Sequence, residues 1–564
     1  MRACIHPTFP VMDAASASSF AVAYAADHGS PPRYTSVDDL RLQERGIKHV
    51  RVQFVDYSNT VRFWVLPVSY FKRICKLARP SMTLSPVALA FVGIRFASGF
   101  NSMGECLFAI DLNSFRVCTY APGHAVVSTW LQEKVPSPTG ALAIPLCPRT
   151  MLQKVVDEAK EKAGLTFLVG FESEFVLLKN ASWPPELVND AGWGCSAGYR
   201  TGAVESSVLD EIVDCVEEAG IEVHFMVGEA APGQYELVTG PMSPLDAADA
   251  LVFTRETIYN IAHKHGLRAT FAPRLLSDNV GSGAHMHLSL HSTVPFTGPD
   301  TRSDAVLAPE LTPTQRSFLQ TLVEHIASLS AITLPTNASY KRVEDGIFSG
   351  GTYACWGWHN KDAPVRLCGD GQANHFEVKT IDGTSNPYLV SAGILAAGLE
   401  GVLNGAELKT GNCAKPAAQM SEEERKAVGL ENPRRFPRTV SDARRMLDED
   451  QYLKEALGAE FVGIYLGVSK VSPLPQQGSN VLTSTVDGAV VRGTYDAAYR
   501  GGDRYPPRRN LLEHVDLFSL DQQRGTLGAS ACRMLEACLN EQRSVGAHRC
   551  HLRETSQAHA GVIC

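Results

Sequence analysis

The stretch from Thr166 to Leu178 reads TFLVGFESEFVLL, an apolar run with two carboxylates, Glu172 and Glu174, two positions apart. Its branched and aromatic residues favour a β-strand, in which successive side chains point to opposite faces. The spacing therefore places both carboxylates on one side of a hydrophobic strand. Two like charges about 4 Å apart repel by roughly 4 kcal/mol at an effective dielectric near 20, so a partly buried pair needs a cation. The alternative is a surface strand with a solvated acidic face.

Three further segments carry polar groups in a related pattern and favour the buried site. They are GEAAPGQYEL with Glu229 and Glu236, GSGAHMHLSL with His285 and His287, and HFEVKTIDGTSNPYL with Glu377 and Lys379. The His pair and the Glu–Lys pair repeat the two-residue spacing among apolar neighbours. Five carboxylates and a histidine suit hard ions such as Mg²⁺ or Mn²⁺, whereas zinc would favour more His or Cys. The sequence therefore predicts a divalent-metal centre with ligands enough for two ions.

Taken in order, these motifs resemble the glutamine synthetase family. The series is E-x-E, E-x-x-x-P-G-Q-Y-E, G-S-G-x-H-x-H-x-S-L, Y-K-R, and E-x-K followed by N-P-Y-L. The resemblance is strongest to the glutamine-synthetase-like branch that includes the fungal FluG-type proteins, and it extends from about Val50 to about Val471. It implies an α+β fold, in which a small β-grasp-like domain precedes a catalytic domain with a curved antiparallel sheet backed by helices.

The chain is expected to have four parts. Residues 1–35 are predicted to be a disordered lead, 36–141 the β-grasp-like domain, 142–471 the catalytic domain, and 472–564 a poorly structured C-terminal extension. The pattern HVRVQFVDYSNTVRFWVLP at 49–67 predicts a β-hairpin. Helices are predicted after a cap at Thr150, from about Ser206 to Ala219, and from Ser243 to Gly266. Strands alternating with these helices indicate a mixed sheet.

Composition narrows the classes of function. A net charge of −8 without a basic cluster argues against a nucleic-acid partner. Fourteen cysteines without a C-x-x-C pair indicate reduced thiols rather than a disulfide scaffold or a zinc framework. No run of about 18 apolar residues suggests a membrane span, and no secretory or transit signal is evident. We therefore expect a cytoplasmic protein.

The resemblance implies a role for each polar site residue. One metal ion would be bound by Glu174, Glu229 and Glu236, and the other by Glu172, His285 and Glu377. The catalytic residues would be Arg342, which would meet the transferring phosphoryl group or the substrate carboxylate, and Lys361, which would meet the nucleotide phosphates. The ATP-binding residues would be Ser289 and Arg366, and the substrate-binding residues would be Gly281, His287 and Lys379. A buried structural role for His287 and surface ion pairs for Arg342 and Arg366 are the alternatives.

The chain departs from the family pattern where ammonium and the amino acid would bind. Ammonia-using members have an acidic residue in the loop after Y-K-R, where Phe348 stands here, and an aspartate whose place falls on Ala97 or Ser98. Lys379 replaces the usual arginine and lacks its bidentate fork, while Val280 replaces an asparagine and cannot hydrogen-bond through its side chain. An organic amine or a modified carboxylate thus becomes an alternative to ammonia and glutamate.

The activity implied by the resemblance is an ATP-dependent carboxylate–amine ligase. ATP would phosphorylate the γ-carboxylate of glutamate, and ammonia or a primary amine would displace phosphate to give a γ-glutamyl amide. ATP as co-substrate, two or more Mg²⁺ or Mn²⁺ ions per site and a homo-oligomeric ring are implied with it. The runner-up is a catalytically silent oligomer with an assembly or signalling role. A metal-dependent amidohydrolase ranks third because no further His or Asp motif suggests its general base.

Overall fold

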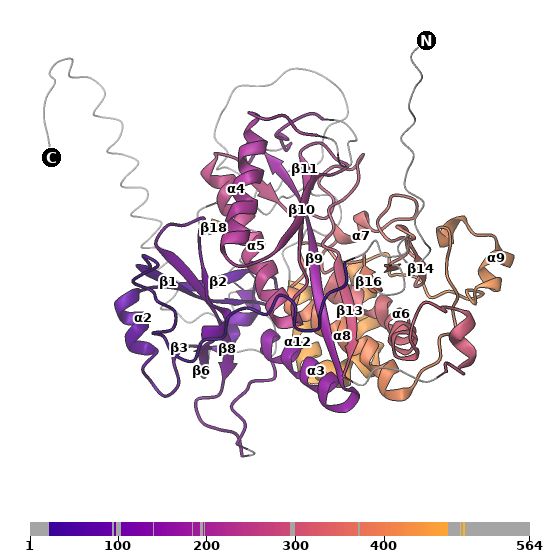
Figure 1. Cartoon of the computed structure of the whole chain (residues 1–564), viewed down its shortest axis with the longest axis horizontal. Coiled ribbons are helices and arrows are strands. Elements are labelled where there is room, and N and C mark those ends of the chain that lie inside the picture. The colour runs from indigo at the N-terminus through magenta and orange to yellow at the C-terminus, as the bar shows by residue number, and fades with distance from the viewer. Residues whose placement is uncertain are drawn as a thin grey trace, which may run out of the picture. The chain divides into compact units, whose positions relative to one another are not determined.

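The computed structural model describes residues 22–471 with short gaps at 93–94, 97–102, 139, 183, 192–195, 197, 294–298 and 370–372. It also describes two short strands, β17 (Thr485–Val486) and β18 (Ala489–Val490), which pair with each other. Within these residues the chain forms an α+β fold with two principal sheets, shown in Figure 1. The C-terminal extension predicted over 472–564 otherwise lies outside the described residues, as does the lead up to residue 21.

The smaller sheet contains the predicted hairpin. Its strand order is β2-β1-β8-β6-β3, with β7 paired to β8. The strands are β1 (His49–Val55), β2 (Val61–Pro67), β3 (Ser81–Leu84), β6 (Cys106–Ile110), β7 (Arg116–Val117) and β8 (His124–Gln132). Strands β1 and β2 are antiparallel, and Asp56 closes their turn by accepting hydrogen bonds from the Ser58 and Thr60 amides at 3.0 and 2.9 Å. The hairpin prediction is therefore confirmed.

Shorter elements complete the N-terminal region. They are α2 (Val68–Ile74), the strands β4 (Phe91–Val92) and β5 (Arg95–Phe96), and the 3-10 helices Pro86–Ala90 and Leu112–Ser114. The side chain of Asn59 in the hairpin turn donates to the Gly383 carbonyl at 3.1 Å, and Asn386 donates to the Asp56 carbonyl at 3.0 Å. The hairpin turn is thus held against the segment that follows the E-x-K motif.

Residues 22–35 differ from the disordered lead predicted for 1–35. Three side chains of this segment bond to the body of the protein: Tyr24 to His224 at 2.9 Å, His28 to Glu222 at 2.7 Å, and Arg33 to Asp246 at 2.9 Å. The segment contains no described helix or strand. Side-chain contacts with partners about 200 residues away therefore order it, which a local sequence pattern does not reveal.

The larger sheet is built around one long strand, β9 (Leu165–Leu178), which carries the E-x-E motif. Its order is β10-β11-β9-β13-β16-β15-β14, with β12 also paired to β9. The other strands are β10 (Val223–Gly228), β11 (Gln234–Thr239), β12 (Arg268–Thr270), β13 (Met286–Ser292), β14 (Trp356–Trp358), β15 (Val365–Cys368) and β16 (His375–Val378). All pairs are antiparallel except β14 with β15. Figure 1 shows β9, β13 and β16 side by side.

The three predicted helices are present with shifted ends, and each of them contacts the large sheet. The helices are α3 (Pro148–Ala163), α4 (Val204–Glu218), α5 (Pro244–Lys264), α6 (Pro313–Thr333), α7 (Ser339–Arg342), α8 (Pro387–Asn404), α9 (Glu422–Ala427), α10 (Val440–Glu449), α11 (Gln451–Leu457) and α12 (Ala459–Val471), with 3-10 turns at Ser303–Val306 and Ala417–Gln419. Helix α3 begins before the predicted cap, because Pro148 needs no N–H partner in the first turn.

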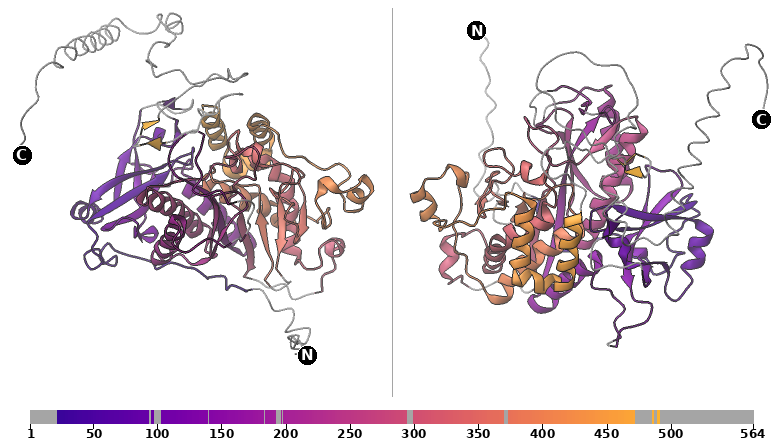
Figure 2. Two further views of the ribbon diagram at one scale, coloured as in Figure 1. Left: turned by 90° about the horizontal axis from the view of Figure 1, so that it is seen from above. Right: turned by 180° about the vertical axis from the view of Figure 1, so that it is seen from behind.

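Helix α8 forms part of the core against α6. A Cβ added at Gly401 would lie 1.9 Å from the Ser317 carbonyl oxygen, so glycine permits the close approach of the two helices. By length and composition α8 is also apolar enough to cross a membrane, but 78% of its apolar window is buried inside the protein. Figure 2 shows the orange helices of this region on one side of the large sheet. Burial against protein accounts for the apolar character of α8.

Candidate active site

Strands β9 and β11 bring three carboxylates together on one face of the large sheet. Glu174 lies opposite Glu236 in the antiparallel register, and Glu172 is two residues from Glu174 on the same face. Glu174 and Glu236 are 8% and 7% exposed, and the side chain of Glu172 is 13% exposed. The E-x-E motif is therefore a buried acidic pair, and not the solvated strand face of the alternative reading.

The H-x-H and E-x-K segments complete this face from the other side of β9. His285 Nδ1 lies 2.7 Å from Glu172 Oε2 and 3.3 Å from Glu377 Oε1. His287 Nε2 lies 2.8 Å from Glu172 Oε1, and His287 is opposite Glu377 in the β13–β16 register. We call the five carboxylates and His285 the acid cluster, whose members are Glu172, Glu174, Glu229, Glu236, Glu377 and His285.

Among the described residues, three fixed cations lie beside the acid cluster. Lys379 Nζ is 3.1 Å from Glu377 Oε1, and Arg366 pairs with the other oxygen of that carboxylate. Arg342 Nη2 is 3.1 Å from His285 Nε2 and donates to the Lys379 carbonyl at 3.2 Å. Arg342 is 3% exposed and the side chain of Arg366 is 18% exposed, so neither has the surface position of the alternative interpretation. Five carboxylates thus face three permanent positive charges.

The excess of carboxylates over cations affects the pKa values of the carboxyl groups. Burial raises the pKa of Glu236 to about 10, and repulsion from Glu172, Glu174 and Glu229 adds to the effect. Burial, followed by the charge of Glu174, raises the pKa of Glu229 to about 7. These two groups resist ionisation because the protein does not supply enough positive charge around them.

Two other members of the acid cluster have lowered pKa values because positively charged groups lie beside them. Burial opposes ionisation of Glu377, but Lys379 and the neighbouring imidazoles lower its pKa to about 2. Burial likewise opposes ionisation of Glu172, yet His287 and His285 hold its pKa well below the usual range. The acid cluster therefore has a neutralised side near Lys379 and an uncompensated side near Glu236.

The donor atoms form two groups that could each hold a metal ion. In the first, Glu172, His285 and Glu377 place one ligand atom apiece within 4.8 Å of one another. In the second, Glu174, Glu236 and His285 do the same. Oxygen-rich sets with one imidazole fit Mg²⁺ or Mn²⁺. A divalent ion would also relieve the repulsion that raises the pKa values of Glu229 and Glu236.

Glu229 was expected to share an ion with Glu174 and Glu236, but it is not part of the second group. It follows β10, and its carboxylate accepts a hydrogen bond from the adjacent Ala230 amide at 2.9 Å. The charge of Glu174 still contributes to the raised pKa of Glu229, so we keep Glu229 within the acid cluster. The structure thus brings the other two carboxylates together and leaves Glu229 at the edge.

Two neighbouring residues escaped the sequence reasoning. Gln234, which is 2% exposed, donates to Glu174 at 3.3 Å and to the Gly281 carbonyl at 3.1 Å. The Gly283 amide donates to Glu174 at 2.8 Å, and a Cβ at Gly283 would lie 2.5 Å from Arg342 Nη2. Both residues orient Glu174. Their positions inside the P-G-Q-Y-E and G-S-G-x-H motifs were the available signal.

The remaining predicted site residues are less closely joined to the acid cluster. Ser289 lies on β13 and shares a hydrogen bond of 2.9 Å with His291. A Cβ at Gly281 would meet the Pro273 carbonyl oxygen at 2.2 Å, so glycine is required by packing there. Lys361 is exposed before β15 and makes no hydrogen bond or ion pair with the acid cluster among the described residues.

The loop after α7 places Phe348 in an unusual conformation. Phe348 has φ of +59° and is 56% exposed, while its amide donates to Asp362 at 3.1 Å. An exposed aromatic side chain held at positive φ is uncommon and favours a functional reading of this loop. Val280 is partly buried. Ala97 and Ser98, where the family aspartate would fall, lie outside the described residues.

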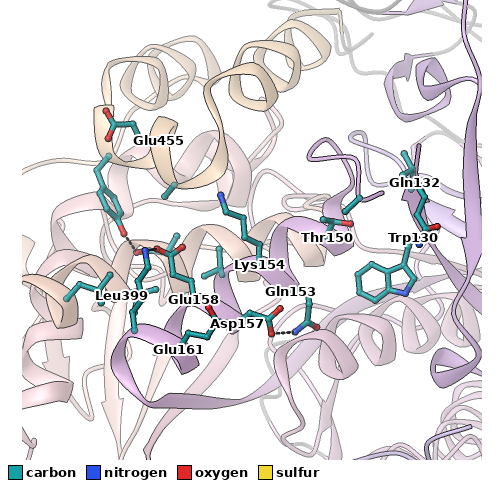
Figure 3. Close-up of a pocket in the computed structure, with 18 residues that line it drawn as sticks. Trp130, Gln132, Thr150, Gln153, Lys154, Asp157, Glu158, Glu161, Leu399 and Glu455 are labelled. Carbon is teal, nitrogen blue, oxygen red and sulfur yellow. Dashed lines mark hydrogen bonds and ion pairs between the residues drawn. The ribbon is translucent and has the colours of Figure 1, made fainter. Parts of the chain in front are cut away.

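A separate pocket of about 840 Å³ lies between α3, α8, α11 and β8. Figure 3 shows its lining, in which Gln153 donates to Asp157 at 2.8 Å. A second polar pair in the lining joins Lys162 to Glu158 at 2.6 Å. The pocket contains no member of the acid cluster, and we therefore place the candidate active site on the sheet face and not here.

Comparison with known proteins agrees with this architecture. The model of the glutamine synthetase catalytic domain matches residues 145–472. Protein FluG of Emericella nidulans is 31% identical over 461 residues, covering 79% of this chain. This chain spans about half of FluG's length, 49%.

Two further similarities concern an amine ligase and a solved structure. Gamma-glutamylpolyamine synthetase GlnA3 of Streptomyces coelicolor is 28% identical over 428 residues, covering 74% of this chain and 88% of that protein. The solved GmaS complex with ADP has a TM-score of 0.61 at 24% identity, covering 78% of this chain and 95% of that one, and it shows the same fold. The catalytic-domain match over more than half of the chain shows that this protein belongs to the glutamine synthetase family.

Proposed function

We propose that this chain is an ATP-dependent carboxylate–amine ligase, which phosphorylates the γ-carboxylate of glutamate and forms a γ-glutamyl amide with ammonia or a primary amine. The observation that carries the proposal is the acid cluster, because four carboxylates on one sheet face, with Glu229 at their edge, adjoin three fixed cations. Such a surplus of buried negative charge is costly for a purely structural sheet. It suits a site that binds cations together with a polyphosphate.

The ligands for the proposed ions divide between the two groups of the acid cluster. One ion would be held by Glu172, His285 and Glu377, and the other by Glu174 and Glu236 with Glu229 at its edge. Bound Mg²⁺ or Mn²⁺ would neutralise the ATP phosphate oxygens during transfer. Gln234 and the Gly283 amide hold Glu174 in place for this purpose.

Basic side chains of the site are placed to bind anionic groups. Arg342 Nη1 is buried without a hydrogen-bond partner among the described residues, so it can donate to a phosphoryl or carboxylate oxygen. Arg366 and Lys379 both contact Glu377, which a divalent ion would also engage, and they would then be free to bind ATP and glutamate. Positioning and charge neutralisation are the main requirements of phosphoryl transfer. Lys361 and Ser289 would lie on the nucleotide side, and Gly281 and His287 on the substrate side.

The choice of nitrogen donor depends on the loop that carries Phe348. An ammonium ion needs a carboxylate to bind it and accept its proton, whereas Phe348 offers an exposed aromatic surface. The apolar part of a primary amine could cover that surface, at about 25 cal/mol per Å² buried. Similarity to a gamma-glutamylpolyamine synthetase supports an organic amine. We therefore favour a primary amine over ammonia.

Family members typically form oligomers, and we propose a homo-oligomeric ring for this chain as well. We also place it in the cytoplasm, with small-molecule substrates and no nucleic-acid or membrane partner. The second candidate function is a catalytically silent oligomer that serves in assembly or signalling. It is motivated by the replacements at Phe348, Lys379 and Val280. Against it stands the retained donor set of the acid cluster.

The test is ADP release from ATP with Mg²⁺, glutamate and a panel containing ammonium, polyamines, ethanolamine and aromatic amines. Mass spectrometry of the product should show a γ-glutamyl amide. We expect turnover with at least one primary amine that exceeds the turnover with ammonium. Turnover with none of the panel, by protein that is folded and oligomeric, would favour the silent oligomer.

A further inference from the structure

A second kind of ligand cluster adjoins the acid cluster on the same sheet. His287 on β13, Cys368 at the end of β15 and His375 at the start of β16 each place one ligand atom within 4.8 Å of the others. We call these residues the His–Cys cluster. It contains two imidazoles and one thiol, in contrast to the carboxylates of the acid cluster.

Strand register explains why the three side chains meet. Cys368 lies opposite His375 in the β15–β16 pair, and His287 lies opposite Glu377 in the β13–β16 pair. His375 and Glu377 are two residues apart on β16, so both point to the same face. The His–Cys cluster therefore lies on the same sheet face as Glu377, next to the acid cluster.

Hydrogen bonds orient both imidazoles for metal binding. His375 Nδ1 lies 3.2 Å from the Ala373 carbonyl oxygen, which only accepts, so Nδ1 carries the proton and Nε2 keeps its lone pair. His287 Nε2 lies 2.8 Å from Glu172 Oε1, so the neutral tautomer with its proton on Nε2 would offer the Nδ1 lone pair to a metal ion. Histidines that bind metals usually donate their other ring N–H to a carbonyl or carboxylate in this way.

Burial raises the pKa of the Cys368 thiol to about 11 and the Arg366 guanidinium opposes that rise, so a bound metal ion would have to displace the thiol proton. Cys368 is 8% exposed, and Arg366 Nε lies 3.1 Å from its Sγ. A guanidinium at this distance stabilises the negative charge that a sulfur ligand carries. Among the described cysteines, this is the one whose sulfur joins two histidines in a candidate metal group.

We propose that the His–Cys cluster binds a zinc-class ion, with His287, Cys368 and His375 as its protein ligands. Two nitrogen donors and one sulfur donor suit Zn²⁺ or Co²⁺, whereas Mg²⁺ selects oxygen. Three protein ligands leave a fourth tetrahedral position open to water or to a substrate oxygen. The site is thus distinct in chemistry from the two groups of the acid cluster.

Occupation of this site would inhibit the ligase. His287 would be a ligand of the zinc-class ion, and Arg366 would adjoin the bound sulfur, so both would be withdrawn from the substrate and the nucleotide. This consequence rests on the proposed function, whereas metal binding by the His–Cys cluster does not. Zn²⁺ should therefore inhibit turnover that is measured with excess Mg²⁺.

Co²⁺ is the probe for binding, used with oxygen excluded, a phosphine reductant and millimolar Mg²⁺ to occupy the oxygen sites. Ligation by a thiolate should give a near-ultraviolet sulfur-to-cobalt absorption band that Zn²⁺ abolishes. Cys368→Ser should remove this band, and His375→Gln should weaken Co²⁺ binding by at least about 100-fold, since even outer-shell changes cost 10–100-fold. Cys75→Ser, a half-buried thiol at the end of α2, is the matched control and should retain the band.

Inhibition supplies the second measurement. Cys368→Ser should keep its Mg²⁺-supported turnover and need at least about tenfold more Zn²⁺ for half-inhibition. Absence of the band in the wild-type protein would overturn the proposed site, and so would a band that survives both Cys368→Ser and His375→Gln. If the band behaves as expected in a protein without ligase turnover, the zinc-class site stands and the proposed function fails.

Discussion

Two clusters of buried charge lie in the same chain and differ in how they are neutralised. In the Arg149 cluster, the guanidinium of Arg149 pairs with Asp249 and with Asp111 at 2.5 Å, and the Tyr388 hydroxyl donates to Asp249 at 2.5 Å. The Trp130 ring lies 4.5 Å from the guanidinium carbon. Each of the two carboxylates has a direct ion pair with Arg149, although burial still raises the pKa of Asp111.

In the acid cluster, by contrast, Glu229 and Glu236 have no ion pair with any described residue. Its five carboxylates adjoin three fixed cations, and Glu236 and Glu229 have pKa values raised to about 10 and about 7. The contrast separates a structural role from a functional one. A cluster built for stability contains its own counter-charges, whereas a binding site leaves room for charges that arrive with ligands.

The largest expected effect follows from removing one acid-cluster ligand. Glu236→Gln should lower kcat/KM by at least about 100-fold, because direct ligands matter more than outer-shell groups, whose loss costs 10–100-fold in metal affinity or activity. The metal-free variant should unfold at about the same temperature as the wild type, since Glu236 with its raised pKa is already uncharged there and Gln is a neutral group of similar size. Steady-state kinetics and thermal melts in EDTA provide the two readouts. A variant with normal turnover would remove Glu236 from the metal site.

Replacing a residue of the Arg149 cluster should instead lower the stability of the fold. Arg149→Leu leaves Asp111 and Asp249 buried without their cation, which should cost about 3–5 kcal/mol of unfolding free energy. Urea denaturation measures this loss. Lys162→Leu is the control, because the exposed Lys162–Glu158 pair contributes roughly 0–1 kcal/mol. Equal stability of the two variants would contradict the structural role of the Arg149 cluster.

A smaller effect is expected at the edge of the candidate active site. Phe348→Glu should shift the preference between the best amine and ammonium toward ammonium by about 1–3 kcal/mol, if one charge-assisted hydrogen bond is restored. The ratio of the two kcat/KM values is the measurement. Phe348→Gln removes the ring without adding charge and should lose amine turnover without gaining ammonium turnover. An unchanged ratio in Phe348→Glu would show that this loop does not contact the nitrogen donor.

The smallest effect concerns a third buried cluster, in which His325 lies between Asp450 at 2.7 Å and Glu400 at 2.6 Å. Burial opposes protonation of His325, but the two carboxylates raise its pKa above the ordinary value of 6.5. Its stabilisation is therefore fully present below pH 6.5 and is lost as pH rises through the raised pKa. His325→Gln should remove this pH-dependent part of the unfolding free energy, measured by urea denaturation at several pH values. A variant with the wild-type pH dependence would contradict this linkage.

The sequence predicted correctly those features that depend on the two-residue alternation of side chains along a strand. The two-residue spacing of Glu172 and Glu174 predicted their shared face, and alternation around residues 56–59 predicted the hairpin. Such patterns depend on neighbours along the chain. They also located the family motifs, whose order carried the resemblance.

Other features depend on contacts between distant segments and could not be predicted locally. Tyr24 is held by His224, about 200 residues away. Cys368 and His375 meet only because β15 and β16 pair in one register, and neither belongs to a recognisable spacing motif. Glu229 was assigned by motif; it follows β10 and does not belong to the donor groups formed by the described residues.

The central claim is that the acid cluster is completed by divalent cations, and manganese binding tests it most directly. Titration of the metal-free wild-type protein, followed by the electron paramagnetic resonance of free Mn²⁺, should show two bound ions per chain. Glu236→Gln should lose one of them, while Lys162→Leu should keep both. Absence of Mn²⁺ binding by folded wild-type protein, or full binding by Glu236→Gln, would contradict the account.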